Sequence, residues 1–194
     1  MAVKNREYKT GEGKAGLKNI PFQKRLEPHL DELKWLYMEL YDNQQMFEGL
    51  CSGMEEFCRA RRASLKRLDT KREKNPGWFR KSSMLGMMMY TDQFAGTLTG
   101  VKEKLDYIES CNVNYLHLMP LLDTPRGRSD GGYAVSDFRK VRDGLGTMDD
   151  LRALADECHK RGISLCLDFV MNHTSEEHEW AKRARAGERE YRDR

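Results

Sequence analysis

Hydrophobic residues between positions 22 and 74 recur at helical spacing. The first series is three or four residues apart and comprises Leu26, Leu30, Leu33, Tyr37 and Leu40. The second follows Asp42–Asn43 and comprises Phe47, Leu50, Met54 and Phe57, with Leu65 and Leu68 further along. Each series lies on one face of a helix, and the polar break between them supplies an N-cap. We therefore expect two long helices that pack as an antiparallel pair, the second ending at Asn75-Pro76-Gly77.

After Ser83 the pattern changes to short apolar runs that alternate with helical ones. The runs typical of strands are 85–90, 113–119 and 163–170, and a helix is expected over 98–110. Thr147 and Asp150 have the spacing of a capping box, and Gly162 is placed to end the helix that they begin. Continuously apolar strands separated by helices are typical of a parallel sheet, so this half is expected to be α/β. Three strands do not distinguish an open sheet from a barrel.

These patterns divide the chain into three parts. Residues 1–20 are polar and rich in Lys and Gly, which predicts a flexible arm. Residues 21–83 are expected to form an N-terminal helical domain, and residues 84–194 the α/β domain. The connection from 120 to 146 is unusually long and follows the carboxyl end of the second expected strand. Since α/β proteins build their sites at that end of the strands, we expect the functional residues there.

Composition narrows the possible partners. Charged residues make up 34% of the 194, above the usual ~25%, but the net charge is only +3. The basic stretch 59–74 fits the solvated end of a helix and lacks the interleaved aromatic residues of a nucleic-acid surface. Neither a signal segment nor a membrane span is visible, and the five cysteines form no C-x-x-C pair. We expect a soluble, cytoplasmic protein that binds neither nucleic acid nor membrane and has no disulfide framework.

The long connection contains the first candidate site. Asp130 and Tyr133 flank two glycines, which let a carboxylate and an aromatic ring approach a ligand closely. This pairing suits hydrogen bonding and stacking against a sugar, although an ordinary Asp-Gly-Gly turn explains the same residues. The glycine spacing matches neither a dinucleotide fingerprint nor a Walker loop, so nucleotide binding is not expected.

The second candidate site follows the third expected strand and contains Asp168, Asn172 and His173. A histidine at this position can donate to a ligand hydroxyl while it remains neutral. The alternative, left open by the spacing, is that Asp168 and Asn172 satisfy backbone groups of the next turn and His173 caps them. A metal held by Asp168, His173 and His178 is disfavoured, because the spacing is not H-E-x-x-H and no cysteine pair assists. We therefore expect no metal and no cofactor.

Together these residues resemble the α-amylase-type glycoside hydrolases, and within them the amylosucrase branch. The segment Asp168-Phe-Val-Met-Asn172-His173 is similar to the first signature of that family. Four further segments look specific to the branch: Tyr90-Thr-Asp92-Gln-Phe94-Ala-Gly, Tyr115-Leu-His-Leu-Met-Pro120, Ser129-Asp-Gly-Gly-Tyr-Ala-Val135 and Asn172-His-Thr-Ser-Glu-Glu-His-Glu-Trp180. The helical pair ending near Asn75-Pro-Gly-Trp78-Phe is similar to the N-terminal helical domain of the branch.

The resemblance implies a (β/α)8 TIM barrel that holds a glucosyl unit of sucrose or an α-glucan. The expected fold is then a truncated barrel, with its first three strands preceded by an N-terminal α-helical domain. By position, Asp130 is expected to hydrogen-bond at the closed end of the pocket, Tyr133 to stack under the sugar ring, and His173 to contact its hydroxyls. Asp168 and Asn172 are expected to shape the loop.

The reaction in this family is retaining and uses two carboxylates that the resemblance places on later strands. No residue of this chain matches them, so no catalytic residue is assigned. We expect an N-terminal fragment of an amylosucrase-like enzyme that is inactive alone and poorly stable, because a three-stranded parallel sheet exposes an edge. The alternatives are a non-catalytic helical and carbohydrate-binding module, or a fragment of a related α-glucosidase or α-amylase.

Overall fold

The computed structural model describes residues 21–192 and divides into two compact units, one up to Phe79 and one from Arg80 onward. The arm expected over residues 1–20 lies outside the described residues.

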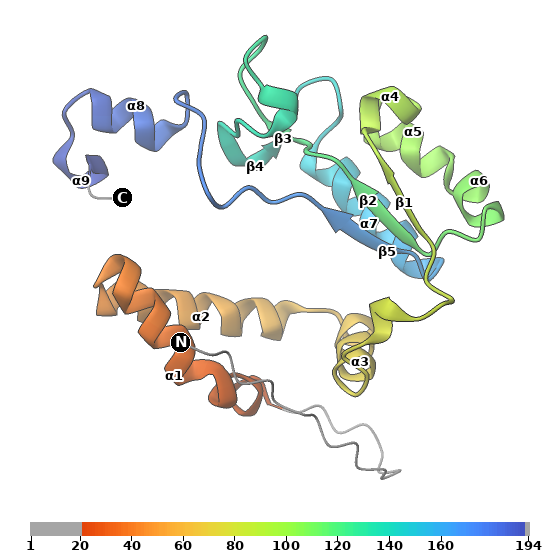
Figure 1. Ribbon diagram of the computed structural model, residues 1–194, viewed down its shortest axis with the longest axis horizontal. Coiled ribbons are helices and arrows are strands. Elements are labelled where there is room, and N and C mark those ends of the chain that lie inside the picture. The colour runs from red at the N-terminus through yellow and green to blue at the C-terminus, as the bar shows by residue number, and fades with distance from the viewer. Residues whose placement is uncertain (1–20, 193–194) are drawn as a thin grey trace. The chain divides into compact units, whose positions relative to one another are not determined.

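Two antiparallel helices make up most of the first unit (Figure 1). Helix α1 spans Phe22–Tyr41 and α2 spans Gln44–Ala60. Asn43 is the N-cap of α2, as expected, and its side chain accepts from the amide of Met46. The pairing is visible at both ends: Tyr37 lies 5.5 Å from Phe47 between ring centroids, and Gln23 donates to Glu55 over 2.7 Å. The predicted antiparallel pair is confirmed.

The continuation of the second helix was expected wrongly. Helix α2 ends at Ala60, and a separate helix α3 spans Ala63–Glu73 before the short 3-10 turn η1, Trp78–Arg80. Arg61 adopts an extended conformation between them, and its guanidinium donates two hydrogen bonds to Asp69, of 2.6 and 2.8 Å. These bonds hold the pKa of the Asp69 carboxyl below its usual value and raise the pKa of Arg61. The break thus gains a tertiary ion pair that a continuous helix would lack.

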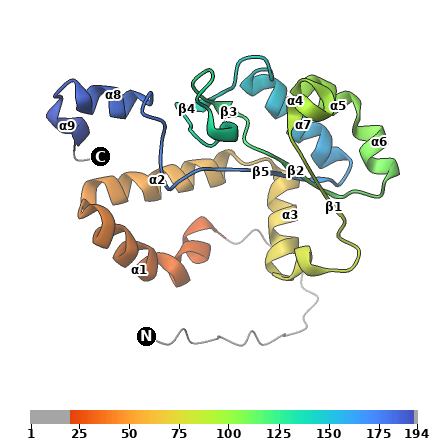
Figure 2. The same ribbon diagram turned by 45° about the horizontal axis from the view of Figure 1, so that its top comes forward.

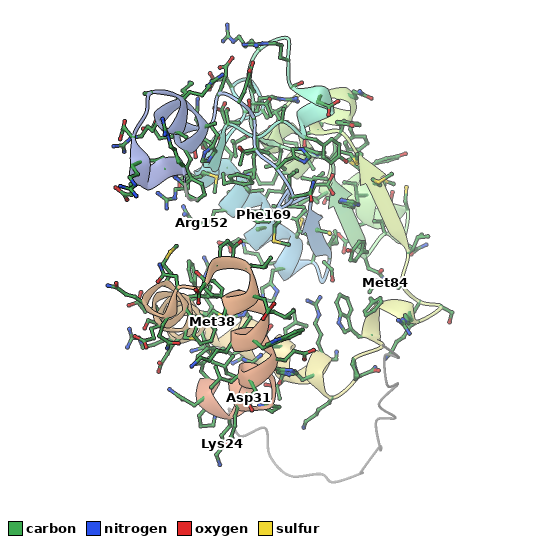
Figure 3. All side chains as sticks on the ribbon, turned by 60° about the vertical axis from the view of Figure 1, so that its left-hand side comes forward. Lys24, Asp31, Met38, Met84, Arg152 and Phe169 are labelled. Carbon is green, nitrogen blue, oxygen red and sulfur yellow. The ribbon has the colours of Figure 1, made fainter. Side chains whose placement is uncertain are left out.

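Much of the apolar surface of these helices remains exposed. Phe47 is buried, whereas Leu40 and Phe57 are 75% and 82% exposed. Figure 3 marks successive double turns of α1 by Lys24, Asp31 and Met38, which are seven residues apart. Helical spacing therefore identified the helices, but only part of each apolar series is packed.

The second unit is built on a parallel sheet of three strands in the order β1-β2-β5. Strand β1 spans Gly86–Met89, β2 spans Tyr115–Leu118 and β5 spans Ser164–Leu167. All three lie inside the runs predicted from the sequence and are shorter than those runs. The adjacent parallel strands and their connecting helices confirm the expected fold class, a truncated α/β barrel-type fold.

Helices α4 to α7 connect these strands (Figure 1). Their bounds are Thr91–Ala95 for α4, Leu98–Glu103 for α5, Leu105–Ser110 for α6 and Met148–Lys160 for α7. The single helix expected over 98–110 is therefore two helices that meet at Lys104, whose ammonium donates to the carbonyl of Phe94 over 3.1 Å. The capping box of Thr147 and Asp150 is present as predicted, and Gly162 has the positive φ of 73° that follows a helix end.

The sheet has two different faces because side chains alternate along a strand. Leu116 and Leu118 of β2 are completely buried in a core that includes Leu98, Leu105 and Leu154 from the helices. The opposite face carries the intervening residues, which the register places side by side: Met88, His117 and Cys166 from the three strands. One face of the sheet thus belongs to the core, and the other presents polar and polarisable groups.

The long connection after β2 contains structure that the sequence pattern did not reveal. Strand β3, Leu122–Asp123, pairs in an antiparallel manner with β4, Asp137–Val141, and the 3-10 turn η2, Asp130–Gly132, lies between them (Figure 2). The chain ends with helices α8, Glu179–Arg185, and α9, Arg189–Arg192. A two-residue strand is too short to show a period, so the loop interpretation of this segment was incomplete.

The five cysteines differ in burial. Burial raises the pKa of Cys158 to about 11, while the other four cysteines, Cys51, Cys58, Cys111 and Cys166, are partly exposed and free. Of the five cysteines, Cys158 is therefore the buried one. Within residues 21–192, no helix is long and apolar enough to cross a membrane.

Candidate functional site

The candidate site lies where the parallel strands end. Tyr90 directly follows β1, Pro120 closely follows β2 and Asp168 directly follows β5. Because the three strands are parallel and adjacent, these residues share the carboxyl edge of the sheet. This is the edge at which α/β proteins place their ligands.

Asp168 is bonded through both of its carboxylate oxygens. Oδ2 accepts the hydroxyl of Tyr133 over 2.9 Å, and Oδ1 lies 2.8 Å from Nε2 of His117. An ionised carboxylate can only accept, so Nε2 of His117 carries the proton in this arrangement. The side chains of His117 and Asp168 are 27% and 20% exposed, so both are half-buried. Asp168 therefore joins strand β2 to the connection that follows it.

Sequence reasoning did not assign a role to His117. The residue lies in one of the sequence words that carried the family resemblance, but it was not named as a site residue. The signal was present, since His117 is the polar residue within the otherwise apolar run Leu116–Met119. Alternation places it on the face opposite Leu116 and Leu118, toward Asp168.

The contact with Asp168 also affects the Tyr133 hydroxyl. Its pKa is raised, first because the hydroxyl donates to Asp168, and then by partial burial, the carboxylate charge and nearby Tyr90. The phenol accordingly keeps its proton and remains a donor across the neutral range. The half-buried Tyr133 ring is thus held at its hydroxyl end as well as at its backbone.

Tyr133 owes its position to an unusual turn. Asp130, Gly131 and Gly132 have positive φ values of 48°, 66° and 100°, and the amide of Tyr133 donates to the carbonyl of Asp130 over 3.1 Å. A Cβ atom on Gly132 would lie 2.9 Å from Cβ of Pro120, which follows β2. Glycine is therefore required for the turn to pack against the end of the strand. The side chain of Asp130 is exposed on the same turn.

The predicted residues Asn172 and His173 lie further along the segment that leaves β5. Both side chains are exposed, and Nδ2 of Asn172 lies 3.5 Å from Nδ1 of His173. This contact is consistent with the expectation that Asn172 shapes the loop beside His173, but it does not test a role in substrate binding. That role remains a prediction.

Several bonds join the segment after β5 to the connection after β2. The amide of Ser175 donates to the carbonyl of Val135 over 2.8 Å, and Arg128 forms ion pairs with Glu176 and Glu177. Phe169, labelled in Figure 3, lies with its ring centroid 5.4 Å from that of Phe138 in β4. With the Asp168–Tyr133 bond, these contacts place the two predicted site segments against each other. The structure thus brings Tyr133 and Asp168 into direct contact, and His173 lies further along the segment that contains Asp168.

The described residues, 21–192, contain no group of three or more His, Cys, Asp or Glu side chains placed to hold a metal ion. His178, which was weighed as a ligand with Asp168 and His173, instead serves as the N-cap of α8. Its Nδ1 accepts from the amide of Trp180 over 3.2 Å.

Curated proteins similar to this chain are enzymes named for α-glucosides. Oligo-1,6-glucosidase of Bacillus sp. (strain F5) is 42% identical over 99 residues, which are 50% of this chain and 19% of that protein. Trehalose synthase/amylase TreS of Mycolicibacterium smegmatis is 49% identical over 90 residues, 46% of this chain and 15% of that protein. The chain spans about a fifth of the length of these relatives or less.

This chain is also similar to a solved structure of an enzyme that acts on a sugar. MutB, a trehalulose synthase of Pseudomonas mesoacidophila MX-45, was solved as a mutant with the substrate sucrose. That structure is 34% identical, has a TM-score of 0.52, and covers 60% of this chain, which covers 22% of it. Residues 62–194 also match the family described as Alpha amylase, catalytic domain, and so include the whole second unit. Because this match includes more than half of the chain, the chain belongs to the alpha-amylase family, and its second unit is part of the catalytic domain of that family.

Proposed function

We propose that this chain carries the sugar-binding side of the glucosyl site of an amylosucrase-like retaining enzyme, which acts on sucrose and α-glucans. Tyr133 provides the surface on which the sugar ring stacks, Asp130 accepts hydrogen bonds from its hydroxyls, and His173 contacts a hydroxyl from the neighbouring segment. The observation that carries this proposal is the 2.9 Å hydrogen bond from Tyr133 to Asp168, which fixes the aromatic ring at the carboxyl edge of the sheet.

The chemistry of these groups suits a hexose. A pyranose ring has apolar C–H faces and a rim of hydroxyls, so it needs an aromatic plane beside donors and acceptors. Tyr133 offers the plane, while the exposed Asp130 and His173 offer the polar groups. Because Asp168 already engages the Tyr133 hydroxyl, the phenol is satisfied without a ligand and the ring face remains for stacking.

The relatives support an α-glucoside as substrate, although they name different glucosides. Their names refer to oligo-1,6-glucosides and trehalose, and MutB was solved with sucrose as its substrate. The amylosucrase assignment rests on the sequence words around Tyr90, Tyr115, Ser129 and Asn172. We extend the substrate to sucrose and α-glucans on the combined strength of those words and the likeness to MutB.

The proposal assigns no catalytic residue to this chain. Retaining glycosidases need a nucleophile and an acid/base about 5–5.5 Å apart, and the resemblance matches neither to a position here. The 194-residue chain is therefore expected to bind glucosides weakly and to leave sucrose intact.

Sugar binding by the full 194-residue chain tests the binding half of this proposal. We expect saturable shifts in NMR spectra on titration with maltose or sucrose, and Tyr133→Ala is expected to weaken binding by about tenfold or more through loss of the stacking surface. The matched control is Tyr107→Ala, which removes an exposed aromatic residue of α6. Equal binding by the Tyr133→Ala and wild-type chains would refute the assignment of the stacking surface.

An assay for released glucose tests the other half. Incubation of the chain with sucrose is expected to give no glucose above a buffer blank, because no residue of this chain matches the carboxylate that attacks the sugar in this family. Turnover that scales with protein concentration would show that the chain contains catalytic groups which the proposal denies it.

A further inference from the structure

Strand β2 presents His117 next to the candidate site, in contact with Asp168. Leu116 and Leu118 face the core, and the register sets His117 beside Cys166, two residues before Asp168 in the neighbouring strand. By the same alternation, Asp168, which directly follows β5, lies on the face of the sheet that carries His117. Half-burial of an imidazole is costly without a partner, and Asp168 provides that partner at 2.8 Å.

This contact constrains the carboxylate of Asp168. A carboxylate bonded through a single oxygen can turn about its Cβ–Cγ bond, whereas one bonded through both oxygens from different elements has its plane fixed. His117 bonds Oδ1 from within the sheet, and Tyr133 bonds Oδ2 from the connection after β2. The imidazole thereby determines where Oδ2 is presented.

The orientation of Oδ2 in turn limits the Tyr133 ring. The ring is attached at Cβ and held at its hydroxyl, so rotation away from the site requires that the hydroxyl leave Asp168. The preceding turn, Asp130–Gly132, fixes the backbone at the other end. The Tyr133 ring is thus restrained by the turn at its backbone and by the Asp168 carboxylate at its hydroxyl. Only the second restraint depends on His117.

We propose that His117 is a positioning residue, which holds Asp168 so that the Tyr133 ring is kept in the orientation on which a glucosyl ring stacks. This inference rests on the function proposed above and adds to it a residue that makes no contact with the sugar.

A set of variants of the full 194-residue chain separates positioning from packing. His117→Phe fills the space without a donor, and His117→Gln restores an N–H donor at a similar reach. Tyr133→Phe keeps the ring but removes the hydroxyl through which His117 is proposed to act. We expect His117→Phe to weaken maltose binding by about tenfold, His117→Gln to recover most of the affinity, and His117→Phe to have little further effect in the Tyr133→Phe chain.

A second measurement needs no sugar. The pKa of Tyr133 is followed by NMR of chains with 13C-labelled tyrosine, and its signal is assigned from its loss in Tyr133→Phe. We expect the raised pKa of Tyr133 to fall toward the ordinary value in His117→Phe, because an unrestrained Asp168 no longer holds the hydroxyl. Asp168→Asn removes the charge and provides the reference for a released Tyr133.

The outcomes separate this inference from the proposed function. An unchanged or further raised pKa of Tyr133 in His117→Phe would overturn the positioning role, as would equal losses of affinity in the wild-type and Tyr133→Phe backgrounds. If the wild-type chain binds no sugar, the proposed function fails, and the pKa of Tyr133 still decides whether His117 positions it. If His117→Phe does not fold, the pKa of Tyr133 is compared between His117→Gln and Asp168→Asn. A pKa in His117→Gln as low as that in Asp168→Asn would count against the inference.

Discussion

The amide of Ser175 donates to the carbonyl of Val135 over 2.8 Å, and both residues are buried. This bond lies two residues after His173 and two residues after Tyr133, so it joins the two segments that carry these side chains. Asp168 bonds Tyr133 on the other side of His173. The segment that contains His173 is therefore restrained by a bond before it, at Asp168, and by one after it, at Ser175, although the His173 side chain is exposed. An exposed imidazole on a restrained backbone is well placed to contact a ligand.

Substitution of His173 is expected to affect binding and not stability. His173→Ala removes an exposed side chain whose described contact is with Asn172, so the free energy of unfolding should change by no more than about 0.5 kcal/mol. If His173 contacts a sugar hydroxyl, maltose affinity should fall by about tenfold. Urea denaturation and NMR titration measure the two quantities. The control is His29→Ala on α1, and a His173→Ala chain that binds maltose as well as this control would remove His173 from the site.

The capping box of α7 predicts a loss of stability in acid. Hydrogen bonds from the side chain and backbone of Thr147 hold the pKa of Asp150 below its usual value. A carboxyl whose pKa is lowered by folding contributes stability above its unfolded pKa of about 3.9, and this contribution is lost as the pH falls through the folded pKa. Asp150→Asn should therefore be less stable than wild type at pH 7, and the difference should shrink below pH 4.

The measurement is urea denaturation from pH 7 down to the lowest pH at which the wild type still folds. Thr147→Val is the companion variant and should lose about 1 kcal/mol at pH 7, because the helix loses its N-cap. A difference between wild type and Asp150→Asn that is constant with pH would show that ionised Asp150 does not support the helix.

Thr91 at the start of α4 predicts a stabilising substitution. Its side chain is buried, and within residues 21–192 its hydroxyl has no hydrogen-bond partner. Replacement by Val keeps the shape and removes an unsatisfied polar atom, so Thr91→Val should raise the free energy of unfolding by about 1 kcal/mol. Thr97→Val is the control, since the Thr97 hydroxyl caps α5 by accepting from Gly100 over 3.0 Å. That variant should be destabilised, and a loss of stability in Thr91→Val would contradict the prediction.

The open strands predict self-association of the 194-residue chain. Among the described strands, β1 and β5 each have a partner on one side only. Met88 on β1 and Met171 after β5 are 66% and 84% exposed. Exposed edges with apolar side chains favour pairing between chains, so sedimentation should show association that grows with concentration.

Charged residues at these two positions should reduce that association. The double variant Met88→Lys, Met171→Lys places one cation on β1 and one shortly after β5, which disfavours strand addition. Met46→Lys on α2 is the control, because Met46 is also exposed but lies on a helix. A wild-type chain that remains monomeric at all concentrations tested would contradict the prediction.

The features that could be predicted from the sequence are those determined by near neighbours. Thr147, Asp150 and Gly162 define the beginning and end of α7 within one segment, and all three behave as expected. Apolar runs likewise located β1, β2 and β5, because burial of a strand leaves a local signal. The α/β class follows from their alternation with helices.

The errors occur where a distant contact decides. The helix break at Arg61 is accompanied by its two bonds to Asp69, eight residues away, and the break at Lys104 by a bond to the carbonyl of Phe94. In the candidate site, Tyr133 and Asp168 were each named, but their bond across 35 residues could not be read from spacing. The contact between His117 and Asp168 was missed for the same reason, since the two residues are 51 positions apart.

The four residues of β2 alternate between the two faces of the sheet. Leu116 and Leu118 are completely buried against the helices, whereas Tyr115 and His117 face the other side of the sheet. A substitution of His117 therefore changes the face that carries the contact with Asp168, whereas one of Leu116 or Leu118 changes the packing against the helices. For an engineer, the two faces of this strand can be mutated independently of each other.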